Sequence, residues 1–436
     1  MNALTARAAD QPSTADRIVV RRGRPLAGAV TPGGAKNSVL KLMAASLLAE
    51  GRYELTNVPG ISDVGTMGEL LGAMGVTMSR DPHDVHRIWL DVPAVVIPEA
   101  PYELAEAIRA SIVVMGPLLA RCGEARISLP GGDDFGTRPI DMHIRGLEAM
   151  GATIELKHGV LHACASSGLR GADITLDFPS VGATENIVMA AVGAKGTTVL
   201  DNAAREPEIS DLLTMLQEMG ADIEGVGSAT LTIHGQPMTV LSNVSHRVIP
   251  DRLEVATFLA SLAVAGGDIT ITDGRAAHME LFLSKLGQIG VTVTDTGSGL
   301  WAHSDGKIRS VDVATLPYPG IATDYKPLIT VMLSLGDGVG IVTENLYAGR
   351  FRYIEELLRM GADIRTNGHH AVVRGVPRLE GAPVKAHDIR AGACLVVAGL
   401  GADGETVIAN PFHIDRGYEN LVGKLSSLGA DIERLN

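Results

Sequence analysis

The sequence contains few aromatic residues, few cysteines and no long apolar run. Phe, Trp and Tyr make up only 3% of the 436 residues, so a core has to be built from Ala, Val, Leu, Ile and Met. No apolar segment reaches the roughly 18 residues of a membrane-spanning helix, so no such span is expected. The cysteines are odd in number and lie beside apolar residues, which favours reduced, packed thiols and a cytoplasmic location. They are Cys122, Cys164 and Cys394.

The chain also lacks an excess of positive charge. It has 37 Lys and Arg against 50 Asp and Glu, and this net charge of −13 argues against a nucleic-acid partner, although a local basic pocket for a small anion stays possible. The sequence has no His-Glu-x-x-His zinc motif, nucleophile elbow or Walker loop. The glycines of 399–404 match a dinucleotide fingerprint only formally, because the pattern places a helix before them and a strand after them. We therefore expect no metal and no cofactor.

One short phrase recurs six times, about every 70 residues. Each copy has Leu, then Met, Ile or Leu three positions later, then Gly, and a short β-branched or alternating run follows. Apolar residues three apart lie on one face of a helix, and the Gly suits the left-handed position that ends it. The copies are Leu71–Gly75, Leu147–Gly151, Leu216–Gly220, Leu286–Gly290, Leu357–Gly361 and Leu425–Gly429.

A second phrase, an apolar helical run that reaches a Gly and passes into a strand, alternates with the first. Val188–Lys195, Gly196 and Thr197–Leu200 are one example. Each of the six units therefore holds two helices, each followed by strand, which predicts a large α/β body of enzyme size. Three units precede the segment Val248–Arg252 and three follow it, so we expect two domains with a crossing there.

The predicted boundaries follow from this division. Residues 1–16 are rich in Ala, Asp, Thr and Ser without an apolar stretch, and they are expected to form a disordered tail rather than a signal peptide. Domain 1 is predicted to comprise residues 17–34 plus 249–436. Domain 2 is predicted to comprise residues 35–248 and to carry a loop at 130–139.

Four places have residues that packing alone does not explain. Three are Gly-rich or small-residue segments, of which two open helices, where free N–H groups suit an anion, and one mixes acids with an Arg as a mobile lid would. The fourth is a scatter of Arg beside Asp in the C-terminal half, as bidentate anion binding needs. For each of these four places, a purely structural interpretation as a turn, a solvated loop or a surface ion pair stays open. The places are Pro32–Ser38, Leu129–Pro139, Pro179–Asn186, and the set Thr323, Asp324, Arg350, Asp388, Arg390, Asp415 and Arg416.

These motifs resemble those of the UDP-N-acetylglucosamine 1-carboxyvinyltransferase family, from about Ile18 to Leu435. The resemblance rests on six segments in the same order, listed below. It implies an enolpyruvyl transferase fold: a two-domain, inside-out α/β barrel in which each domain repeats a βαβαββ unit three times about a pseudo-threefold axis. The segments are Pro32–Ser38, Pro130–Pro139, Pro179–Asn186, Asn202–Pro207, Thr323–Asp324 and His413–Tyr418.

The resemblance also implies an activity and residue roles. The family moves the enolpyruvyl group of phosphoenolpyruvate to the 3-hydroxyl of the UDP-sugar, releases phosphate, and so opens peptidoglycan precursor synthesis. Catalytic roles would fall to Lys36, Asp133 and Asp324. Arg138–Met142 and Pro179–Gly182 would bind the uridine diphosphate. The full set of implied substrate-binding residues is Asn37, Arg109, Arg138, Pro139, Ile140, Asp141, Met142, Pro179, Ser180, Val181, Gly182, Thr323, Leu346, Arg350, Asp388, Arg390 and Arg416.

One departure from the family pattern is chemically large. Most members carry Cys where this chain has Asp133, although some actinobacterial members carry Asp. A carboxylic acid can donate the proton if its site raises its pKa. It resists alkylation by the epoxide fosfomycin, which attacks a thiolate, so resistance is expected.

Other departures lie on the sugar side and leave the acceptor open. Ala322, Tyr325 and Lys326 stand in a run that commonly reads Pro-Gly-Phe-Pro-Thr-Asp-x-Gln, and Leu346 and Tyr347 stand where Val-Phe is commoner. A paralogue that acts on another uridine nucleotide, such as UMP in nucleoside-antibiotic assembly, is the alternative. An inactive nucleotide-binding regulator is a minor one. The oligomeric state does not follow from the sequence.

Overall fold

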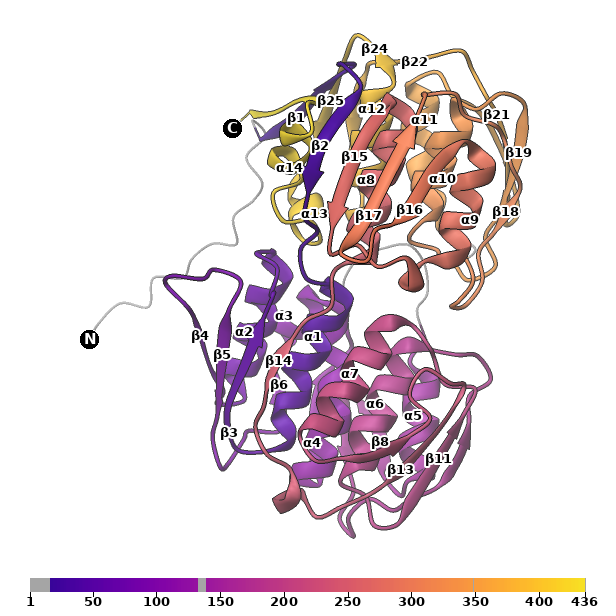
Figure 1. Cartoon of the computed structure of the whole chain (residues 1–436). Helices are drawn as coiled ribbons and strands as arrows, with labels where there is room; N and C mark the ends of the chain where they lie inside the picture. Colours follow the sequence, from indigo (N-terminus) through magenta and orange to yellow (C-terminus); the bar gives the residue numbers. More distant parts are fainter. Residues whose placement is uncertain (1–15, 132–138, 348, 436) are drawn as a thin grey trace. The chain divides into compact units, whose positions relative to one another are not determined.

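The computed structural model describes residues 16–131, 139–347 and 349–435, which form two compact units (Figure 1). Unit 1 comprises the described residues within Met1–Pro32, Leu253–Leu316 and Ile321–Asn436. Unit 2 comprises those within Gly33–Arg252 and Pro317–Gly320. Of the predicted tail, residues 1–15 lie outside the described part, and Asp16 accepts hydrogen bonds of 2.8 and 2.7 Å from Arg434.

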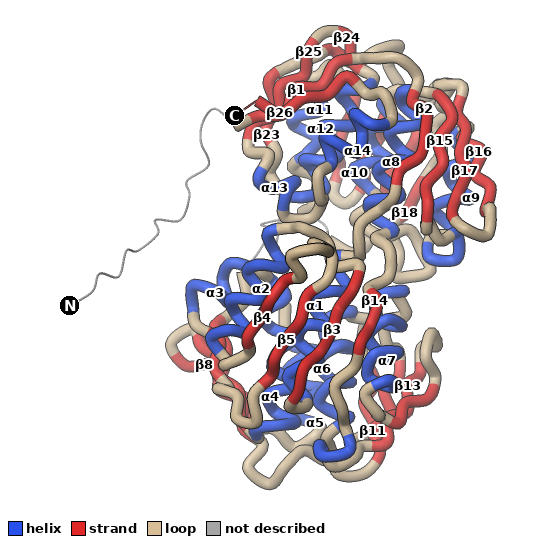
Figure 2. Tube along the Cα trace, turned by 60° about the vertical axis from the view of Figure 1, so that its left-hand side comes forward, coloured by secondary structure: helices blue, strands red, loops and turns tan. Residues whose placement is uncertain are grey.

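Unit 2 contains three four-stranded sheets, and the strands β4, β5, β3 and β14 of one of them lie side by side in Figure 2. The first has the order β14-β3-β5-β4, the second β6-β7-β9-β8 and the third β10-β11-β13-β12. The strands are β3 (Gly51–Thr56), β4 (Thr77–Arg80), β5 (Ile88–Val92), β6 (Glu99–Ala100), β7 (Glu124–Ser128), β8 (Thr153–Lys157), β9 (Val160–Cys164), β10 (Asp173–Thr175), β11 (Thr197–Asp201), β12 (Asp222–Glu224), β13 (Thr230–His234) and β14 (Ser245–Arg247).

Unit 1 also contains three four-stranded sheets, with a two-stranded pair of β22 (Leu379–Glu380) and β24 (Ala402–Asp403). Their orders are β16-β17-β15-β2, β18-β19-β21-β20 and β23-β25-β1-β26. The strands are β1 (Arg17–Arg21), β2 (Leu26–Val30), β15 (Gly267–Thr272), β16 (Val291–Asp295), β17 (Gly299–Ser304), β18 (Val313–Ala314), β19 (Val339–Thr343), β20 (Asp363–Asn367), β21 (His370–Arg374), β23 (Pro383–Lys385), β25 (Glu405–Ala409) and β26 (Asp431–Leu435).

All six four-stranded sheets share one pattern of strand pairing, which confirms the sixfold repeat. In each sheet one strand pairs parallel with a neighbour on one side and antiparallel on the other, as β3 does with β14 and β5. The same arrangement recurs at β7, β11, β15, β19 and β25.

Two classes of helix accompany the sheets. Inner helices are buried over most of their length: α1 (Lys36–Ala45), α4 (Met115–Cys122) and α6 (Val181–Val192) in unit 2, and α8 (Arg252–Ala265), α10 (Lys326–Ser334) and α12 (Ile389–Leu400) in unit 1. Outer helices bury one face: α2 (Ser62–Ala73), α5 (Asp141–Ala149), α7 (Pro207–Glu218), α9 (Glu280–Ile289), α11 (Tyr353–Arg359) and α14 (Leu421–Ser427). Shorter segments are α3 (Tyr102–Ala107), α13 (Phe412–Asp415) and the 3-10 turns η1 (Ser46–Leu48), η2 (Arg109–Val114), η3 (Met238–Val240) and η4 (Ala276–His278).

The repeated Leu-x-x-Met-Gly phrase ends the outer helices. All six glycines have a positive φ, from +83° at Gly361 to +122° at Gly290. In five copies the residue after the Gly donates its N–H to the carbonyl of the Leu, as Val76 does to Leu71 at 3.1 Å. Such a bond closes a helix end in the left-handed conformation, which Gly adopts without steric cost.

Each unit has its own aliphatic core, as the shortage of aromatic residues predicts. One apolar cluster runs from Val39 to Val248 and the other from Ile18 to Ile432. Within the described residues, no helix is both long and apolar enough to cross a membrane.

The unit boundaries differ in detail from the predicted ones. Gly33, Gly34, residues 249–252 and residues 317–320 belong to unit 2 rather than to domain 1. Gly34 pairs with Pro250 as an isolated bridge, and the Asp251 N–H donates to the Gly33 carbonyl at 2.9 Å. The buried Arg252 guanidinium donates to Glu208 on α7 at 3.0 Å. These contacts attach both segments of the crossing, residues 33–34 and 249–252, to unit 2.

Candidate active site

In unit 1, two arginines converge on Asp324. Arg350 donates from Nη2 to Asp324 Oδ1 at 2.9 Å, and Arg390 Nε lies 3.5 Å from the same oxygen. Both arginines are buried, while the Asp324 side chain stays 27% exposed. Burial alone lowers the pKa of Arg350, but Asp324 and Asp388 outweigh it and raise this pKa above its ordinary value. The cluster is therefore a charged, partly accessible carboxylate held by two cations.

Asp388 positions one of these arginines. It caps α12, because its carboxylate accepts the N–H groups of Arg390 at 2.8 Å and Ala391 at 2.9 Å. The cap fixes the first turn of the helix and hence the origin of the Arg390 side chain. Asp388 thus fixes the start of Arg390 through the backbone, and its negative charge also acts on the neighbouring Arg350.

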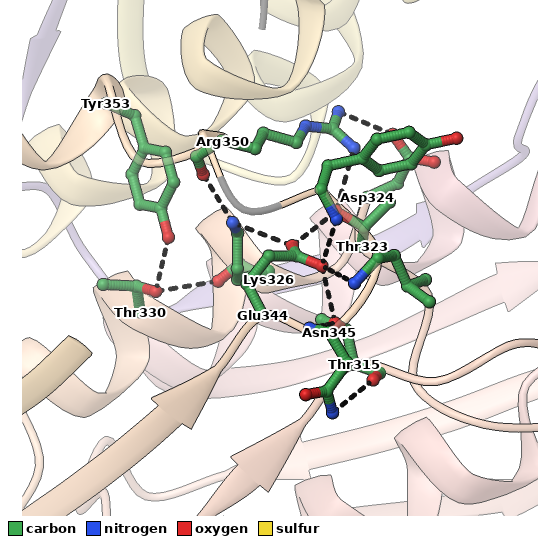
Figure 3. Close-up of polar contacts among 11 residues, drawn as sticks. Thr315, Thr323, Asp324, Lys326, Thr330, Glu344, Asn345, Arg350 and Tyr353 are labelled. Carbon is green, nitrogen blue, oxygen red and sulfur yellow. Dashed lines mark hydrogen bonds and ion pairs between the residues drawn. The ribbon is translucent and has the colours of Figure 1, made fainter. Parts of the chain in front are cut away.

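A buried carboxylate, that of Glu344, contacts Thr323 next to Asp324 and was not among the predicted residues (Figure 3). Glu344 follows β19, and its Oε2 accepts from the Thr323 hydroxyl at 2.7 Å and lies 2.8 Å from Lys326 Nζ. Its Oε1 accepts from the Thr315 hydroxyl at 2.7 Å. The Glu344 and Lys326 side chains are 0% exposed. Only the position of Glu344 directly after a strand gives a sequence signal for it.

Two more predicted residues of unit 1 lie in loops. The N–H of Leu346 donates to Glu344 Oε1 at 2.8 Å, so its backbone is fixed by the buried carboxylate. Arg416 ends α13 and is partly buried. Its neighbour Asp415 accepts two hydrogen bonds of 2.8 Å from Arg434. Asp415 therefore forms a surface ion pair, one of the alternative interpretations given for this set.

In unit 2, Lys36 starts α1. Its N–H donates to Asp251 at 3.2 Å, and its Nζ lies 2.7 Å from the Asp63 carboxylate. The preceding turn requires Gly34, because a Cβ there would come within 1.8 Å of the Asn57 carbonyl oxygen. Asn37 is the partly buried next residue of the helix. Asp63 and Asp251 were missed because isolated acids carry no motif.

The loop of residues 129–139 is described only at its ends. Arg109, at the start of η2, donates to the Pro130 carbonyl at 3.4 Å, and the Gly131 N–H donates to Ala105 at 3.4 Å. The predicted catalytic residue Asp133 and the predicted substrate-binding residue Arg138 lie outside the described residues. The hydrogen bond of Arg109 nevertheless ties one predicted substrate-binding residue to the start of this loop.

The two segments predicted to bind uridine meet at neighbouring helix starts. Pro139–Met142 lead into α5 and Pro179–Gly182 into α6, where the Ser180 hydroxyl accepts the Ala183 N–H at 3.3 Å. A Cβ on Gly182 would come within 2.9 Å of the His143 ring, so the segments touch there. Free N–H groups at both starts suit a diphosphate.

His143 links these segments through a neutral imidazole. Its Nδ1 lies 2.8 Å from Asn186 Nδ2, an amide that also donates to the Ile112 carbonyl at 2.9 Å. Burial, with a smaller effect of Arg109, lowers the pKa of His143 to about 4. The amide donates to Nδ1, so the ring proton resides on Nε2.

A surface groove and the metal-ligating residue types of the described residues were the other candidates for a site. A surface groove of about 820 Å³ in unit 1 is lined by Gly306, Lys307, Arg309 and Asp337 among others, and it includes none of the predicted residues. Among the described residues, no group of three or more His, Cys, Asp or Glu side chains is arranged to hold a metal.

Comparison with known proteins decides the family. Residues 20–425 match the family model of EPSP synthase (3-phosphoshikimate 1-carboxyvinyltransferase). The chain is 50% identical over 426 residues to UDP-N-acetylglucosamine 1-carboxyvinyltransferase of Mycobacterium leprae, covering 97% of this chain and 99% of that protein. It is 49% identical to the protein of that name from an Anaeromyxobacter species, with coverage of 96% and 99%. The chain belongs to the UDP-N-acetylglucosamine 1-carboxyvinyltransferase family.

Solved structures place the fold of this family member among the enolpyruvyl transferases. The enolpyruvyl transferase NikO from Streptomyces tendae superimposes with a TM-score of 0.86 at 27% identity, covering 97% of this chain and 99% of that one. EPSP synthase from Acinetobacter baumannii gives a TM-score of 0.74 at 18% identity, with coverage of 96% and 99%. The predicted enolpyruvyl transferase fold is thereby confirmed.

Proposed function

We propose that the protein transfers the enolpyruvyl group of phosphoenolpyruvate to the 3-hydroxyl of UDP-N-acetylglucosamine and releases phosphate. The observation that carries this proposal is the identity of about 50% over nearly the full length of relatives that bear this enzyme name. The Asp324 cluster supports it, because a charged and accessible carboxylate suits the attacking hydroxyl.

The chemistry is an addition followed by an elimination. A proton adds to C3 of phosphoenolpyruvate while the sugar oxygen forms a bond to C2 and its own proton passes to a base. The C2–O bond to phosphate then breaks, C3 loses a proton and the double bond re-forms. Net transfer therefore needs one acid, one base and cations that stabilise the departing phosphate.

The residues divide between these tasks. Asp324 accepts the hydroxyl proton and orients the acceptor, with Arg350 and Arg390 fixing its carboxylate. Asp133 donates the proton to C3. Lys36, Arg109, Arg138 and Arg416 bind the phosphate and carboxylate groups of phosphoenolpyruvate.

The acceptor's nucleotide part is assigned to the two helix starts of unit 2. The N–H groups at Pro139–Met142 and Pro179–Gly182 hold the diphosphate, and the half-buried apolar residues among them, Ile140 and Val181, cover the uracil. Asn37 and Leu346 contact the sugar. Both candidate acceptors contain the uridine that this assignment requires, but only UDP-N-acetylglucosamine contains the diphosphate.

The test is phosphate release from phosphoenolpyruvate with each acceptor supplied separately. We expect turnover with UDP-N-acetylglucosamine and a product that carries a carboxyvinyl ether. Turnover with UMP alone would assign the chain to the paralogous reaction. Tight binding of nucleotide without any phosphate release would indicate the regulatory homologue.

A further inference from the structure

The Glu344 carboxylate accepts hydrogen bonds from two segments of unit 1. One segment carries Thr323 and Asp324, and the other carries Leu346 and Arg350. From one segment it receives the Thr315 and Thr323 hydroxyls and the Lys326 ammonium. From the other it receives the backbone N–H groups of Leu346 at 2.8 Å and Tyr347 at 3.1 Å. A single buried side chain therefore sets the spacing of the Thr323–Asp324 turn and the loop that carries Leu346 and Arg350 (Figure 3).

Lys326 completes this junction from the first residue of α10. Its Nζ donates to the Arg350 carbonyl and lies 4.0 Å from the centre of the Phe351 ring. Burial lowers the pKa of Lys326 to about 8, and the Glu344 carboxylate offsets part of this effect. A fully buried ion pair adds little stability over apolar packing, so its value lies in the geometry that it specifies.

The hydroxyl of Thr323 connects the buried Glu344 to the Asp324 cluster. It has one proton, which it donates to Glu344 Oε2 at 2.7 Å. Its oxygen therefore accepts from Arg350 Nη1, at 3.2 Å. The same guanidinium donates from Nη2 to Asp324 at 2.9 Å. Glu344, Thr323, Arg350 and Asp324 are thus joined by three hydrogen bonds, in which Arg350 donates to both Thr323 and Asp324 and Thr323 donates to Glu344.

We propose that Glu344 and Lys326 are the positioning pair of the acceptor side of the reaction. Glu344 orients Asp324 through Thr323 and Arg350, and it holds the backbone at Leu346 and Tyr347 where the sugar binds. Neither side chain touches a substrate, because both are 0% exposed. This inference rests on the proposed enolpyruvyl transfer and names two residues that neither the motifs nor the family resemblance assigned a role.

The first test breaks the chain at Thr323. Thr323→Val keeps the shape but removes the hydroxyl, so Arg350 loses its acceptor. At saturating phosphoenolpyruvate, kcat should fall roughly 10- to 100-fold, as expected for a lost hydrogen bond to charged groups, with a smaller change in the acceptor KM. Thr323→Ser restores the hydroxyl and should recover most of the lost kcat. Equal activity of the Val and wild-type proteins, or equal loss in the Val and Ser variants, would overturn the proposal.

The second test changes the buried pair. In Glu344→Gln, the amide N–H₂ faces at least one N–H or O–H group that donates to the carboxylate in the wild type, so one hydrogen bond is replaced by two opposed donors. We therefore expect a raised acceptor KM as well as a lower kcat. Lys326→Gln keeps donors for Glu344 and Arg350, whereas Lys326→Met keeps none. The Gln variant should therefore retain a lower acceptor KM than the Met variant. Identical acceptor KM values for the wild type and all three variants would contradict the role in the loop.

A matched control separates positioning from simple loss of stability. Ser334 lies on α10, is fully buried, and donates to the Thr330 carbonyl at 2.8 Å without contacting a predicted site residue. Ser334→Ala removes a buried hydroxyl on the same helix and should leave kcat and KM unchanged. If this control lost as much kcat as Thr323→Val at a similar fall in Tm, the junction would be structural only.

Failure of the proposed function is distinguishable from failure of this inference. If the wild type uses UMP, the same variants are compared with UMP as the acceptor, because Asp324 and Arg350 serve any attacking hydroxyl. If no acceptor is turned over, the proposed function is wrong, and calorimetric affinity for UDP-N-acetylglucosamine replaces kinetics. Glu344→Gln should then weaken binding relative to Ser334→Ala, and equal affinities would refute the positioning role.

Discussion

The Lys36 ammonium lies 2.7 Å from the Asp63 carboxylate, and both side chains are at most 10% exposed. Lys36 opens α1 after the Gly-rich turn, while Asp63 lies in the first turn of α2. Removal of one partner from such a pair leaves the other charge buried, which costs more than removal of both. The pair thus allows the structural and chemical roles of Lys36 to be measured separately.

Lys36→Met should lower both stability and activity. The free energy of unfolding should fall by about 3 kcal/mol because Asp63 loses a counter-ion. The kcat/KM for phosphoenolpyruvate should fall roughly 30- to 5,000-fold because an anion site loses a positive charge. The double variant Lys36→Met with Asp63→Asn should regain stability in denaturant titrations but not activity. Recovery of turnover in the double variant would show that Lys36 acts only through packing.

Substitutions of Asp133 test the identity of the proton donor. Asp133→Asn should lose most turnover, because an amide cannot serve as the acid. Asp133→Cys should keep some turnover and become sensitive to fosfomycin, since a thiolate is alkylated by the epoxide and a carboxylate resists it. Phosphate release is measured with and without fosfomycin. Full activity of Asp133→Asn would exclude this residue as the donor.

Asp324→Asn should lower kcat by at least roughly 100-fold, the usual effect of removing a general base. The amide oxygen can still accept from Arg350, so the cluster keeps its geometry and the acceptor KM should change less than kcat. Steady-state kinetics with varied acceptor measures both values. A large rise in KM with unchanged kcat would instead give Asp324 a binding role.

His246 predicts how stability depends on pH. Its two ring nitrogens lie 3.0 Å from Asp211 and 2.7 Å from Glu218. Burial alone lowers its pKa, but the hydrogen bonds to both carboxylates outweigh burial and raise the pKa above its ordinary value. The stabilisation is therefore complete below the unfolded value of about 6.5 and is lost as pH rises through the folded pKa.

The corresponding measurement compares Tm across pH. His246→Gln should be less stable than the wild type near pH 6, and this difference should shrink as pH rises past the folded pKa. His234→Gln, at a side chain on β13 that is 40% exposed, is the matched control substitution. A constant difference between His246→Gln and wild type at every pH would mean that folding leaves the pKa of His246 unchanged, which would contradict this account.

The repeated helix ends were predictable because their signal is local. Leu71, Met74 and Gly75 fix one helix end through a side-chain spacing and a backbone conformation, and neither depends on distant residues. Six copies of the phrase then predicted six similar units, and the six sheets confirm them.

The site was predictable only in part because its contacts are not local. Asp324, Arg350 and Arg390 were predicted separately, but only the fold brings their side chains together. Glu344 was missed, and Lys326 was noted only as a departure from the family pattern, because a Glu after a strand and a Lys at a helix start usually face solvent. Their burial results from packing between segments.

The measurement that tests the central claim most directly is kcat/KM for UDP-N-acetylglucosamine and for UMP in competition with excess phosphoenolpyruvate, from the amounts of the two carboxyvinyl ether products. We predict that the UDP-sugar is enolpyruvylated with the much higher kcat/KM. A higher kcat/KM for UMP would contradict the proposed function and assign the chain to the paralogous reaction.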